Sequence, residues 1–163
     1  MLDERNELLA KLMATENIEV RQMPVPTAYF DVQKRRLVLP NWKNLSEIET
    51  EMMIGHEIGH GFDDQGSQYD GDGNLNNWWS DKDRAEFEAR TAALVEQFNQ
   101  LSPNAAPDVK VNGAFTLGEN IGDLGGMEIA LKAYDISLNG KEAPTIDGFT
   151  AHQRFFVAHA QGW

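Results

Sequence analysis

Apolar side chains recur along much of this chain at intervals of three to four residues, the spacing that places them on one face of an α-helix. The spacing first occurs over residues 2–14, which predicts a short amphipathic helix packed on the core. It recurs over residues 46–62, where Ser46 and Glu49 form a capping box at the start of the predicted helix. The first third of the chain therefore ends in a helix.

Three further helices are expected in the second half of the chain. A long helix begins after Ser80 or Asp81 as the N-cap and carries apolar positions to about residue 101, and Pro103 follows it. The other two cover residues 116–138 and residue 149 to the C-terminus. Glycine-rich turns separate these helices, and no linker is long enough to divide the chain into independent domains.

Two short strands are expected between the first two helices. Residues 28–30 and 37–39 are apolar or aromatic and flank a basic turn at residues 34–36, which is typical of a β-hairpin. Because helical segments dominate the rest of the chain, the pattern predicts an α+β fold that is mostly helical with a small sheet.

The composition is that of a folded domain. The chain has 163 residues, 41% hydrophobic and 25% charged, which suits one ordinary domain. We therefore expect a single domain over residues 1–163, with the first helix and edge strands in residues 1–50 and a helical part in residues 51–163. No apolar run approaches the ~18 residues that span a bilayer, and the N-terminus lacks a signal pattern. The chain is thus expected to be soluble, in a compartment that the sequence leaves open.

Charge and cysteine content narrow the choice of partners. The 26 acidic and 14 basic residues give a net charge of -12, which repels a phosphate backbone, so nucleic acid is not an expected partner. The chain has no cysteine, so a transition-metal site would have to use histidine, aspartate or glutamate.

Such ligands occur in the stretch "HEIGH" of the second predicted helix. His56 and His60 are four residues apart, so their rings share one helical face and can chelate one ion, while Glu57 is placed to act as a general base. Catalytic zinc needs a third protein ligand, for which Glu119 is the candidate. Asp123 shares the helical face of Glu119 and could accept a hydrogen bond from a ligand histidine.

Each part of this pattern also has a simpler interpretation. The histidines and the glutamate between them can form an ordinary solvated helix face, and Glu119 and Asp123 can be acidic residues that the helix dipole stabilises. The combination favours zinc over either alternative.

The stretch "YDGDGNLNNWW" resembles the start of a calcium loop, because Asp70, Asp72 and Asn74 alternate. Leu75 stands where an EF-hand needs glycine, and Asp81 stands where it needs a bidentate glutamate. The stretch is therefore expected to be a glycine-rich turn.

From residue 53 to residue 163 the sequence closely resembles the catalytic domain of the neprilysin family, the M13-type zinc metalloendopeptidases. The matching stretches include "GHEIGHGFDDQG", "VNGAFTLGENIGDLGG" and "IDGFTAHQRFFVAHAQGW". The resemblance implies a zincin fold of the gluzincin, thermolysin-like type, and a peptide substrate cleaved on the amino side of a hydrophobic residue. It also implies one Zn²⁺ per chain held by His56, His60 and Glu119, with Glu57 as catalytic base and Asp123 as a partner of a ligand histidine.

The sequence departs from the family in its substrate-binding strand. That strand carries an Asn-Ala-aromatic-Tyr/Phe motif in the family, and the matching stretch "TAYF" begins with Thr27 and Ala28. Both residues are expected to bind substrate, although threonine lacks the side-chain amide that would hydrogen-bond a peptide backbone at two points.

A second departure is the short segment between this strand and the HExxH helix. The first third of the chain looks more like zinc peptidases of tailed phages, which leaves open that the chain is a chimera or a remodelled minimal domain.

A third departure is that the sequence ends at Trp163, whereas family members continue to a histidine and an arginine that stabilise the oxyanion. Loss of one such donor costs roughly 10²–10³ in rate. The alternative function is therefore a zinc-binding zincin scaffold with little or no catalysis. His152 and His159 are expected to be ordinary, partly exposed histidines, with replacement of the family histidine by one of them as the alternative.

Overall fold

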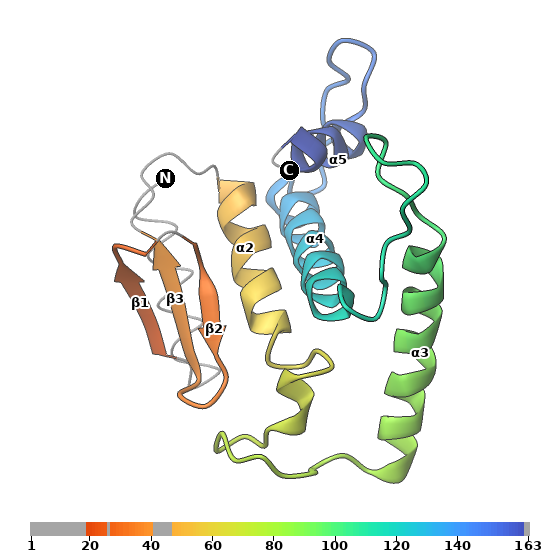
Figure 1. Ribbon diagram of the computed structural model, residues 1–163. Coiled ribbons are helices and arrows are strands. Elements are labelled where there is room, and N and C mark those ends of the chain that lie inside the picture. Colours follow the sequence, from red (N-terminus) through yellow and green to blue (C-terminus); the bar gives the residue numbers. More distant parts are fainter. Residues whose placement is uncertain (1–18, 26, 41–46, 162–163) are drawn as a thin grey trace.

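The computed structural model describes residues 19–25, 27–40 and 47–161 (Figure 1). The helix expected over residues 2–14, and Ser46 of the expected capping box, lie outside the described residues. In chain order the elements are β1 Glu19–Met23, β2 Tyr29–Asp31, β3 Arg36–Pro40, α2 Glu47–Gly59, the short 3-10 helix η1 Gly66–Gln68, α3 Asp81–Asn99, α4 Leu117–Ser137 and α5 Ala151–Gln161.

The three strands form one sheet in the order β1-β3-β2. β2 and β3 are antiparallel, with Tyr29 opposite Val38 and Phe30 opposite Leu37, so the predicted hairpin is confirmed. β1 pairs in parallel with the other side of β3 and was not expected from the sequence. Leu37 and Val38 in the central strand are fully buried, while β2 forms an edge of the sheet among the residues that the structure describes.

The sheet and α2 share a small apolar core. Ala28, Leu37 and Leu39 from the strand region pack with Ile54 of α2, and Phe30 lies against this cluster. Figure 1 shows α2 between the sheet and α4, with α3 beyond α4 and α5 across the end of α4. This arrangement places α2 next to both the edge strand and the N-terminal half of α4.

Glycines allow α2 and α4 to pack unusually closely. A Cβ atom added to Gly55 of α2 would lie 2.9 Å from the Cα atom of Gly126 in α4, and one added to Gly126 would lie 2.5 Å from the carbonyl oxygen of Met52. A Cβ atom on Gly122 would lie 3.0 Å from the ring of His56. The two backbones therefore meet at a distance that larger side chains would prevent.

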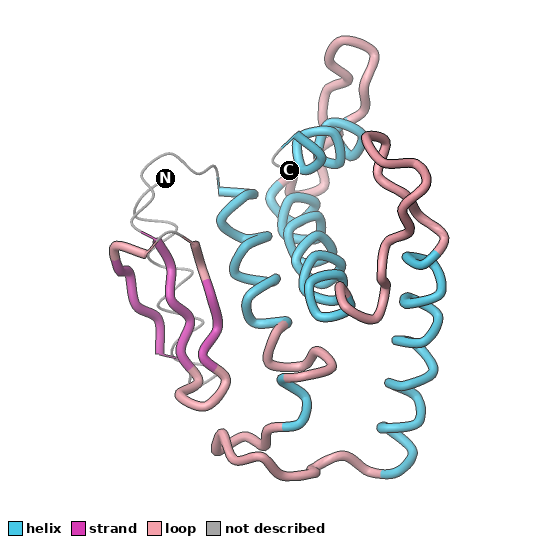
Figure 2. Tube along the Cα trace, in the orientation of Figure 1, coloured by secondary structure: helices cyan, strands magenta, loops and turns pink. Residues whose placement is uncertain are grey.

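The observed helices agree with the expected ones apart from their ends. Ser80 is the N-cap of α3, as expected, and its side chain accepts a hydrogen bond from the backbone N–H of Asp83. α2 ends at Gly59 rather than at residue 62, because the chain turns at residues 60–62. Long loops connect α2 to α3 and α3 to α4 (Figure 2).

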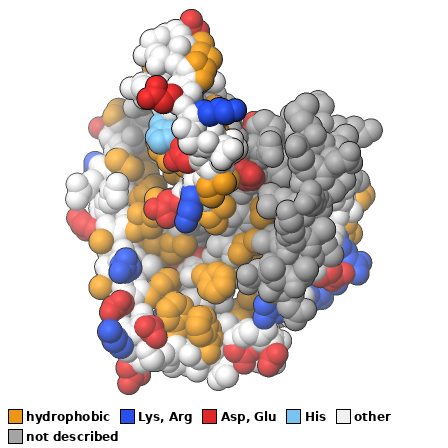
Figure 3. Space-filling model, turned by 180° about the vertical axis from the view of Figure 1, so that it is seen from behind, with side chains coloured by type: hydrophobic (Ala, Val, Ile, Leu, Met, Phe, Trp, Pro, Cys, Tyr) orange, Lys and Arg blue, Asp and Glu red, His pale blue; other side chains and the backbone are white. Residues whose placement is uncertain are grey.

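Several large hydrophobic side chains remain exposed. Phe115, Leu75 and Ile136 are 86%, 71% and 68% exposed, and Figure 3 shows groups of hydrophobic side chains between charged ones on the face seen from behind. Among the helices described here, none combines the length and the apolar character that crossing a bilayer would require. The three most exposed of these hydrophobic side chains lie in different segments of the chain, and only Ile136 is part of a helix.

Candidate metal centre and cleft

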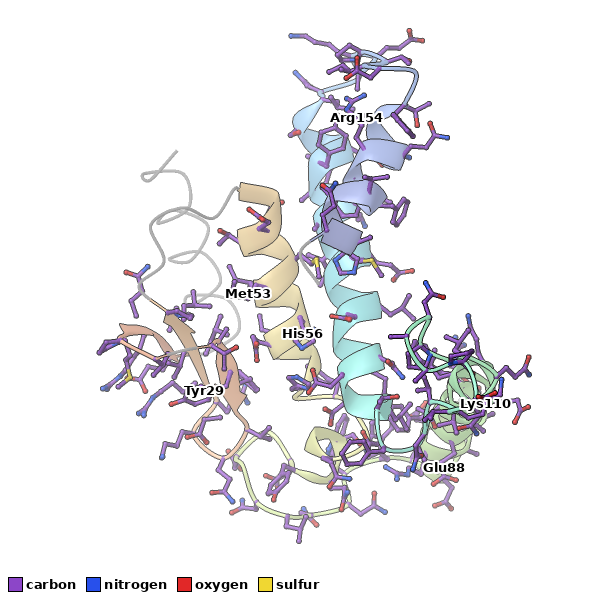
Figure 4. The ribbon with its side chains drawn as sticks, turned by 45° about the horizontal axis from the view of Figure 1, so that its top comes forward. Tyr29, Met53, His56, Glu88, Lys110 and Arg154 are labelled. Carbon is purple, nitrogen blue, oxygen red and sulfur yellow. The ribbon has the colours of Figure 1, made fainter. Side chains whose placement is uncertain are left out.

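His56 of α2 and His60, the residue directly after this helix, face a glutamate in the first turn of α4. The Nε2 atom of His56 lies 3.4 Å from Oε2 of Glu119, and the Nε2 atom of His60 lies 3.8 Å from Oε1 of the same carboxylate. One donor atom from each of these residues can be chosen so that all three lie within 4.8 Å of one another. Figure 4 shows His56 on α2 next to α4, with Tyr29 on the strand across the helix.

The Nδ1 atom of each histidine forms a hydrogen bond with an aspartate. Asp123 of α4 places Oδ1 2.8 Å from the Nδ1 atom of His56, and Asp63 places Oδ2 2.8 Å from the Nδ1 atom of His60. A carboxylate that accepts the Nδ1–H proton leaves Nε2 as the lone-pair donor of the ring. Both Nε2 atoms are thus directed toward Glu119.

This geometry fits the ligand set of a zinc ion. Ligands at about 2.0–2.2 Å in a tetrahedron are separated by about 3.3–3.6 Å, close to the 3.4 and 3.8 Å observed between the Nε2 atoms and the Glu119 oxygens. The side chain of Glu119 is 67% exposed, so the carboxylate can adjust its position. Two imidazoles and a carboxylate leave one position open for water, as catalytic zinc requires.

The electrostatics of the metal-free chain follow from these contacts. The hydrogen bond to Asp123 raises the pKa of His56, and the hydrogen bond to Asp63 raises the pKa of His60. Burial opposes the shifts of both histidines. Burial also raises the pKa of Asp63, but hydrogen bonds from His60 and the backbone of Gly66 outweigh this effect and hold the pKa of Asp63 below its usual value. The histidines therefore bind protons more tightly than free imidazole does when no metal competes.

Glu57 lies on α2 between the two histidines and faces the sheet side of the same site. It is only 7% exposed and lines the cavity that holds the three candidate ligands. Burial raises the pKa of Glu57, an effect that the positive charges of His56 and His60 oppose. A carboxylate with a raised pKa holds an accepted proton more readily than a solvated carboxylate does, which suits the role of a general base.

A cavity of about 960 Å³ connects the candidate ligands with the edge strand and with α5. Thr27 and Ala28, the residues expected to bind substrate, both line it, Thr27 as an exposed residue and Ala28 as a buried one. Met52 and Met53 of α2 form an apolar part of the wall. The cavity has the size and mixed lining of a ligand site.

The two histidines of α5 have different surroundings. His159 lines the cavity, whereas the Nε2 atom of His152 lies 2.7 Å from Oδ1 of Asp135 of α4 in an exposed hydrogen-bonded pair. Of these two histidines, His159 is the one placed to contact a molecule in the cavity, and His152 lies on the surface.

The stretch that resembled a calcium loop is a hydrogen-bonded turn. Oδ1 of Asp70 accepts hydrogen bonds from the backbone N–H groups of Asp72 and Asn74, and Oδ2 accepts one from the side-chain amide of Asn76. Residues 69 and 75 form an antiparallel bridge across the turn. The Asp70 carboxylate is thus engaged by the turn itself, in agreement with the expected glycine-rich turn.

Sequence reasoning missed Asp63 and the glycine contacts. Asp63 follows His60 by three residues but lies after the end of α2, so helical periodicity does not place it. The doublet "DD", which begins three residues after His60, was the available signal. Gly122 and Gly126 recur at a spacing of four on α4, as Gly55 and Gly59 do on α2, and this shared spacing could have indicated the close packing of the two helices.

The model of a protein family described as peptidase family M13 matches residues 17–163. The chain belongs to peptidase family M13. The matched span begins before β1, so the family covers the strand segment that looked more like phage peptidases as well as the helical part.

Individual M13 relatives agree with this assignment. Neprilysin-11 of Caenorhabditis elegans is 48% identical over 116 residues, which cover 68% of this chain and 13% of the relative. Endothelin-converting enzyme 1 of Bos taurus is 40% identical over 158 residues, which cover 86% of this chain and 20% of the relative. The chain therefore spans a fifth or less of the length of these curated relatives.

A solved structure shows the same fold. The crystal structure of the zinc metalloprotease Zmp1 of Mycobacterium tuberculosis in complex with an inhibitor has a TM-score of 0.72 and 50% sequence identity. The similarity covers 83% of this chain and 23% of that chain. Together with the helices and the three-stranded sheet, it identifies the fold as the α+β zincin fold of M13 peptidases, as expected.

Proposed function

We propose that this chain carries the catalytic centre of a zinc-dependent metalloendopeptidase that hydrolyses peptide bonds of oligopeptides. One Zn²⁺ per chain would be held by His56, His60 and Glu119. The observation that carries the proposal is the convergence of two Nε2 atoms on one carboxylate, with both Nδ1 atoms already occupied by aspartates. Membership of peptidase family M13 and the similarity to the zinc metalloprotease Zmp1 support zinc as the metal.

The metal and the residues around it would have different roles in peptide hydrolysis. Bound Zn²⁺ would polarise the scissile carbonyl and lower the pKa of a bound water toward ~7. Glu57 would take a proton from the attacking water and return it to the leaving amine, and its raised pKa favours holding the proton between these two steps. Asp123 and Asp63 keep the two imidazoles in the tautomer that presents Nε2 to the metal.

The edge strand is the proposed binding site for the peptide backbone. β2 lies at an edge of the described sheet, and residues 27–30 line the cavity, so a peptide can add to this edge by β-augmentation. Thr27 and Ala28 are the proposed contacts. Residues 1–50 and 51–163 would act as one zincin domain, which predicts a single cooperative unfolding transition for the zinc-loaded chain.

A fluorogenic peptide assay with zinc quantification tests the function. We expect about one zinc per chain, cleavage that a chelator abolishes, and loss of cleavage in Glu57→Gln with zinc retained. Glu119→Ala is expected to lower the zinc content sharply. Stoichiometric zinc in a wild-type chain that cleaves no peptide would favour the alternative, a zincin scaffold without useful catalysis, and a chain that binds no zinc would overturn both.

A further inference from the structure

The turn of the β2–β3 hairpin docks against the glycine-rich turn at residues 69–75, which we call the Asp70 turn. The guanidinium Nη1 of Arg35 donates a hydrogen bond of 2.5 Å to the carbonyl oxygen of Gly71. On the other side of the contact, a Cβ atom on Gly73 would lie 2.4 Å from the carbonyl oxygen of Gln33. The two turns therefore touch through a side chain and through backbone atoms, and they lie next to each other in Figure 1.

The Asp70 turn is a firm support for this contact. The Asp70 carboxylate accepts hydrogen bonds from Asp72 and Asn74 within the turn and from the side-chain amide of Asn76, directly after it. The backbone N–H of Gly73 donates to the carbonyl oxygen of Asp70 at 2.9 Å. The bridge between Tyr69 and Leu75 closes the turn at its base. A turn with this many internal bonds resists deformation when a neighbouring segment presses on it.

The Asp70 turn is also connected to the end of α2 by hydrogen bonds. Asp63 bonds to the ring of His60 and accepts hydrogen bonds from the backbone N–H groups of Gln65 and Gly66. The backbone N–H of Asn76 then donates to the carbonyl oxygen of Gln68. The chain thus runs from a candidate metal ligand to the Asp70 turn through consecutive hydrogen-bonded segments.

Arg35 occupies a backbone conformation that its residue type does not favour. Its φ angle is 47°, in the left-handed region where glycine or asparagine is adopted more readily. Neither of those residues could reach Gly71 with a cationic donor. The arginine therefore adds a contact that the turn conformation alone does not require.

We propose that Arg35 is a positioning residue that holds the edge strand β2 at a fixed place relative to α2, the helix that carries His56. The apolar core at Ala28 and Phe30 anchors one end of the hairpin, and the contact of Arg35 with Gly71 anchors its turn. A peptide that adds to β2 is then aligned with the candidate ligands. This inference rests on the proposed function, in which β2 binds the substrate backbone.

Substitutions at Arg35 separate the side-chain contact from the backbone conformation. Arg35→Asn and Arg35→Gly both tolerate a positive φ but remove the guanidinium. We expect either change to raise KM for a fluorogenic peptide about fivefold to tenfold while kcat stays within about twofold, the pattern of lost substrate binding. Arg35→Lys, which keeps a cationic donor, should restore most of the affinity. Lys34→Ala in the same turn removes an ion pair with Asp31 and should leave KM within about twofold.

Hydrogen exchange provides a readout that does not depend on catalysis. In the zinc-loaded chain, amide exchange over residues 27–31 should become about tenfold faster in Arg35→Asn. Gly73→Ala attacks the same contact from the other side, and Gly140→Ala is its matched control. The φ angles of Gly73 and Gly140 are 80° and 76°, so both changes bring similar backbone strain, but a Cβ atom on Gly140 would meet no atom within 4 Å. Only Gly73→Ala should speed exchange in β2.

The outcomes distinguish this inference from the proposed function. If the wild-type chain cleaves no peptide, the proposed function fails, and the exchange experiment still decides whether Arg35 holds β2. Exchange over residues 27–31 that is unchanged within about twofold in both Arg35→Asn and Gly73→Ala would overturn the inference. A fall in kcat with KM unchanged in Arg35→Asn would overturn it too, because that result would place the effect of Arg35 on the chemical step and not on alignment of the peptide.

Discussion

The Nδ1 atom of His60 lies 2.8 Å from Oδ2 of Asp63, while the other carboxylate oxygen of Asp63 accepts the backbone N–H groups of Gln65 and Gly66. One buried side chain therefore fixes both the ring of a candidate metal ligand and the course of the loop after α2. The matching partner of His56 is Asp123, which comes from α4, a different helix. The two imidazoles are thus oriented by one local contact and one long-range contact.

Replacing Asp63 by asparagine tests the local contact. The amide oxygen can still accept the N–H groups of Gln65 and Gly66, but the amide nitrogen would then face Nδ1 of His60 and disfavour the tautomer that presents Nε2 to the metal. We expect Asp63→Asn to weaken zinc binding about 10-fold to 100-fold, measured by competition with a chromogenic chelator.

Asp135→Asn is the matched control for this change. It alters a His–Asp pair of similar length, 2.7 Å to His152, that lies outside the cavity. Zinc affinity should be unchanged in this variant. Equal affinities in Asp63→Asn and Asp135→Asn would show that Asp63 does not orient His60.

The close packing of α2 and α4 makes a prediction for Gly126. A methyl group there would lie 2.5 Å from the carbonyl oxygen of Met52 and would push the helices apart. We expect Gly126→Ala to lower the free energy of unfolding by about 1–3 kcal/mol and to weaken zinc binding, because Glu119 would move away from the histidines. Denaturant unfolding and chelator competition measure the two effects.

Gly125 provides the control on the same helix. A Cβ atom added there would meet no atom within 4 Å. Because alanine has the higher helix propensity, Gly125→Ala should raise the free energy of unfolding by up to about 1 kcal/mol and leave zinc affinity unchanged. If Gly126→Ala were equally stabilising, the close contact between the helices would not limit the site.

Zinc affinity should depend strongly on pH. Hydrogen bonds to Asp123 and Asp63 raise the pKa values of His56 and His60 in the metal-free chain, so protons compete with the metal at pH values above the usual histidine pKa of about 6.5. As pH falls through the raised values, affinity should fall by up to about tenfold per histidine for each pH unit. Constant affinity between about pH 6 and 8 would contradict this assignment.

The stability of the metal-free chain should fall as pH rises, whereas zinc affinity should increase. Groups whose pKa is higher in the folded state stabilise that state fully below the unfolded pKa, and the contribution is lost as pH rises through the folded pKa. The raised pKa values of His56 and His60 therefore predict that the metal-free chain becomes less stable as pH rises above about 6.5. Urea unfolding in the presence of a chelator, at several pH values from about 6 upward, measures this trend.

The two histidines of α5 should respond differently to substitution. His159 lines the cavity, so His159→Ala removes part of a wall that a peptide would contact and should change KM about threefold or more. His152→Ala breaks an exposed pair with Asp135 and should leave KM within about twofold. Steady-state kinetics with one fluorogenic peptide compare them, and equal effects would remove His159 from the substrate site.

Local sequence patterns predicted the helices and the hairpin well. The apolar spacing of α2 and α4 and the N-cap at Ser80 depend on neighbouring residues only, so periodicity and capping rules apply directly. β1 was missed because its sequence EVRQM has charged and polar residues and pairs with β3 only after the chain has folded. Long-range parallel pairing leaves no such local signal.

The candidate site could be predicted in part. His56, Glu57 and His60 follow from helix geometry, and Glu119 was chosen because zinc chemistry demands a third ligand. The structure brings the donor atoms of His56, His60 and Glu119 within 4.8 Å of one another. Asp63 and the contacts of Gly126 depend on where α2 ends and how closely α4 approaches, which no periodic pattern contains.

The edge strand β2 is a possible site of aggregation as well as the proposed site of peptide binding. Backbone groups that could pair with a peptide could equally pair with the same strand of a second molecule and begin aggregation. β2 has only three residues, and an ion pair between Asp31 and Lys34 lies at its end. The short length of β2 and the charges of Asp31 and Lys34 limit pairing with a second copy of the strand, but they leave room for a brief contact with a peptide. The features that allow β2 to bind a substrate would therefore also protect the chain from self-association.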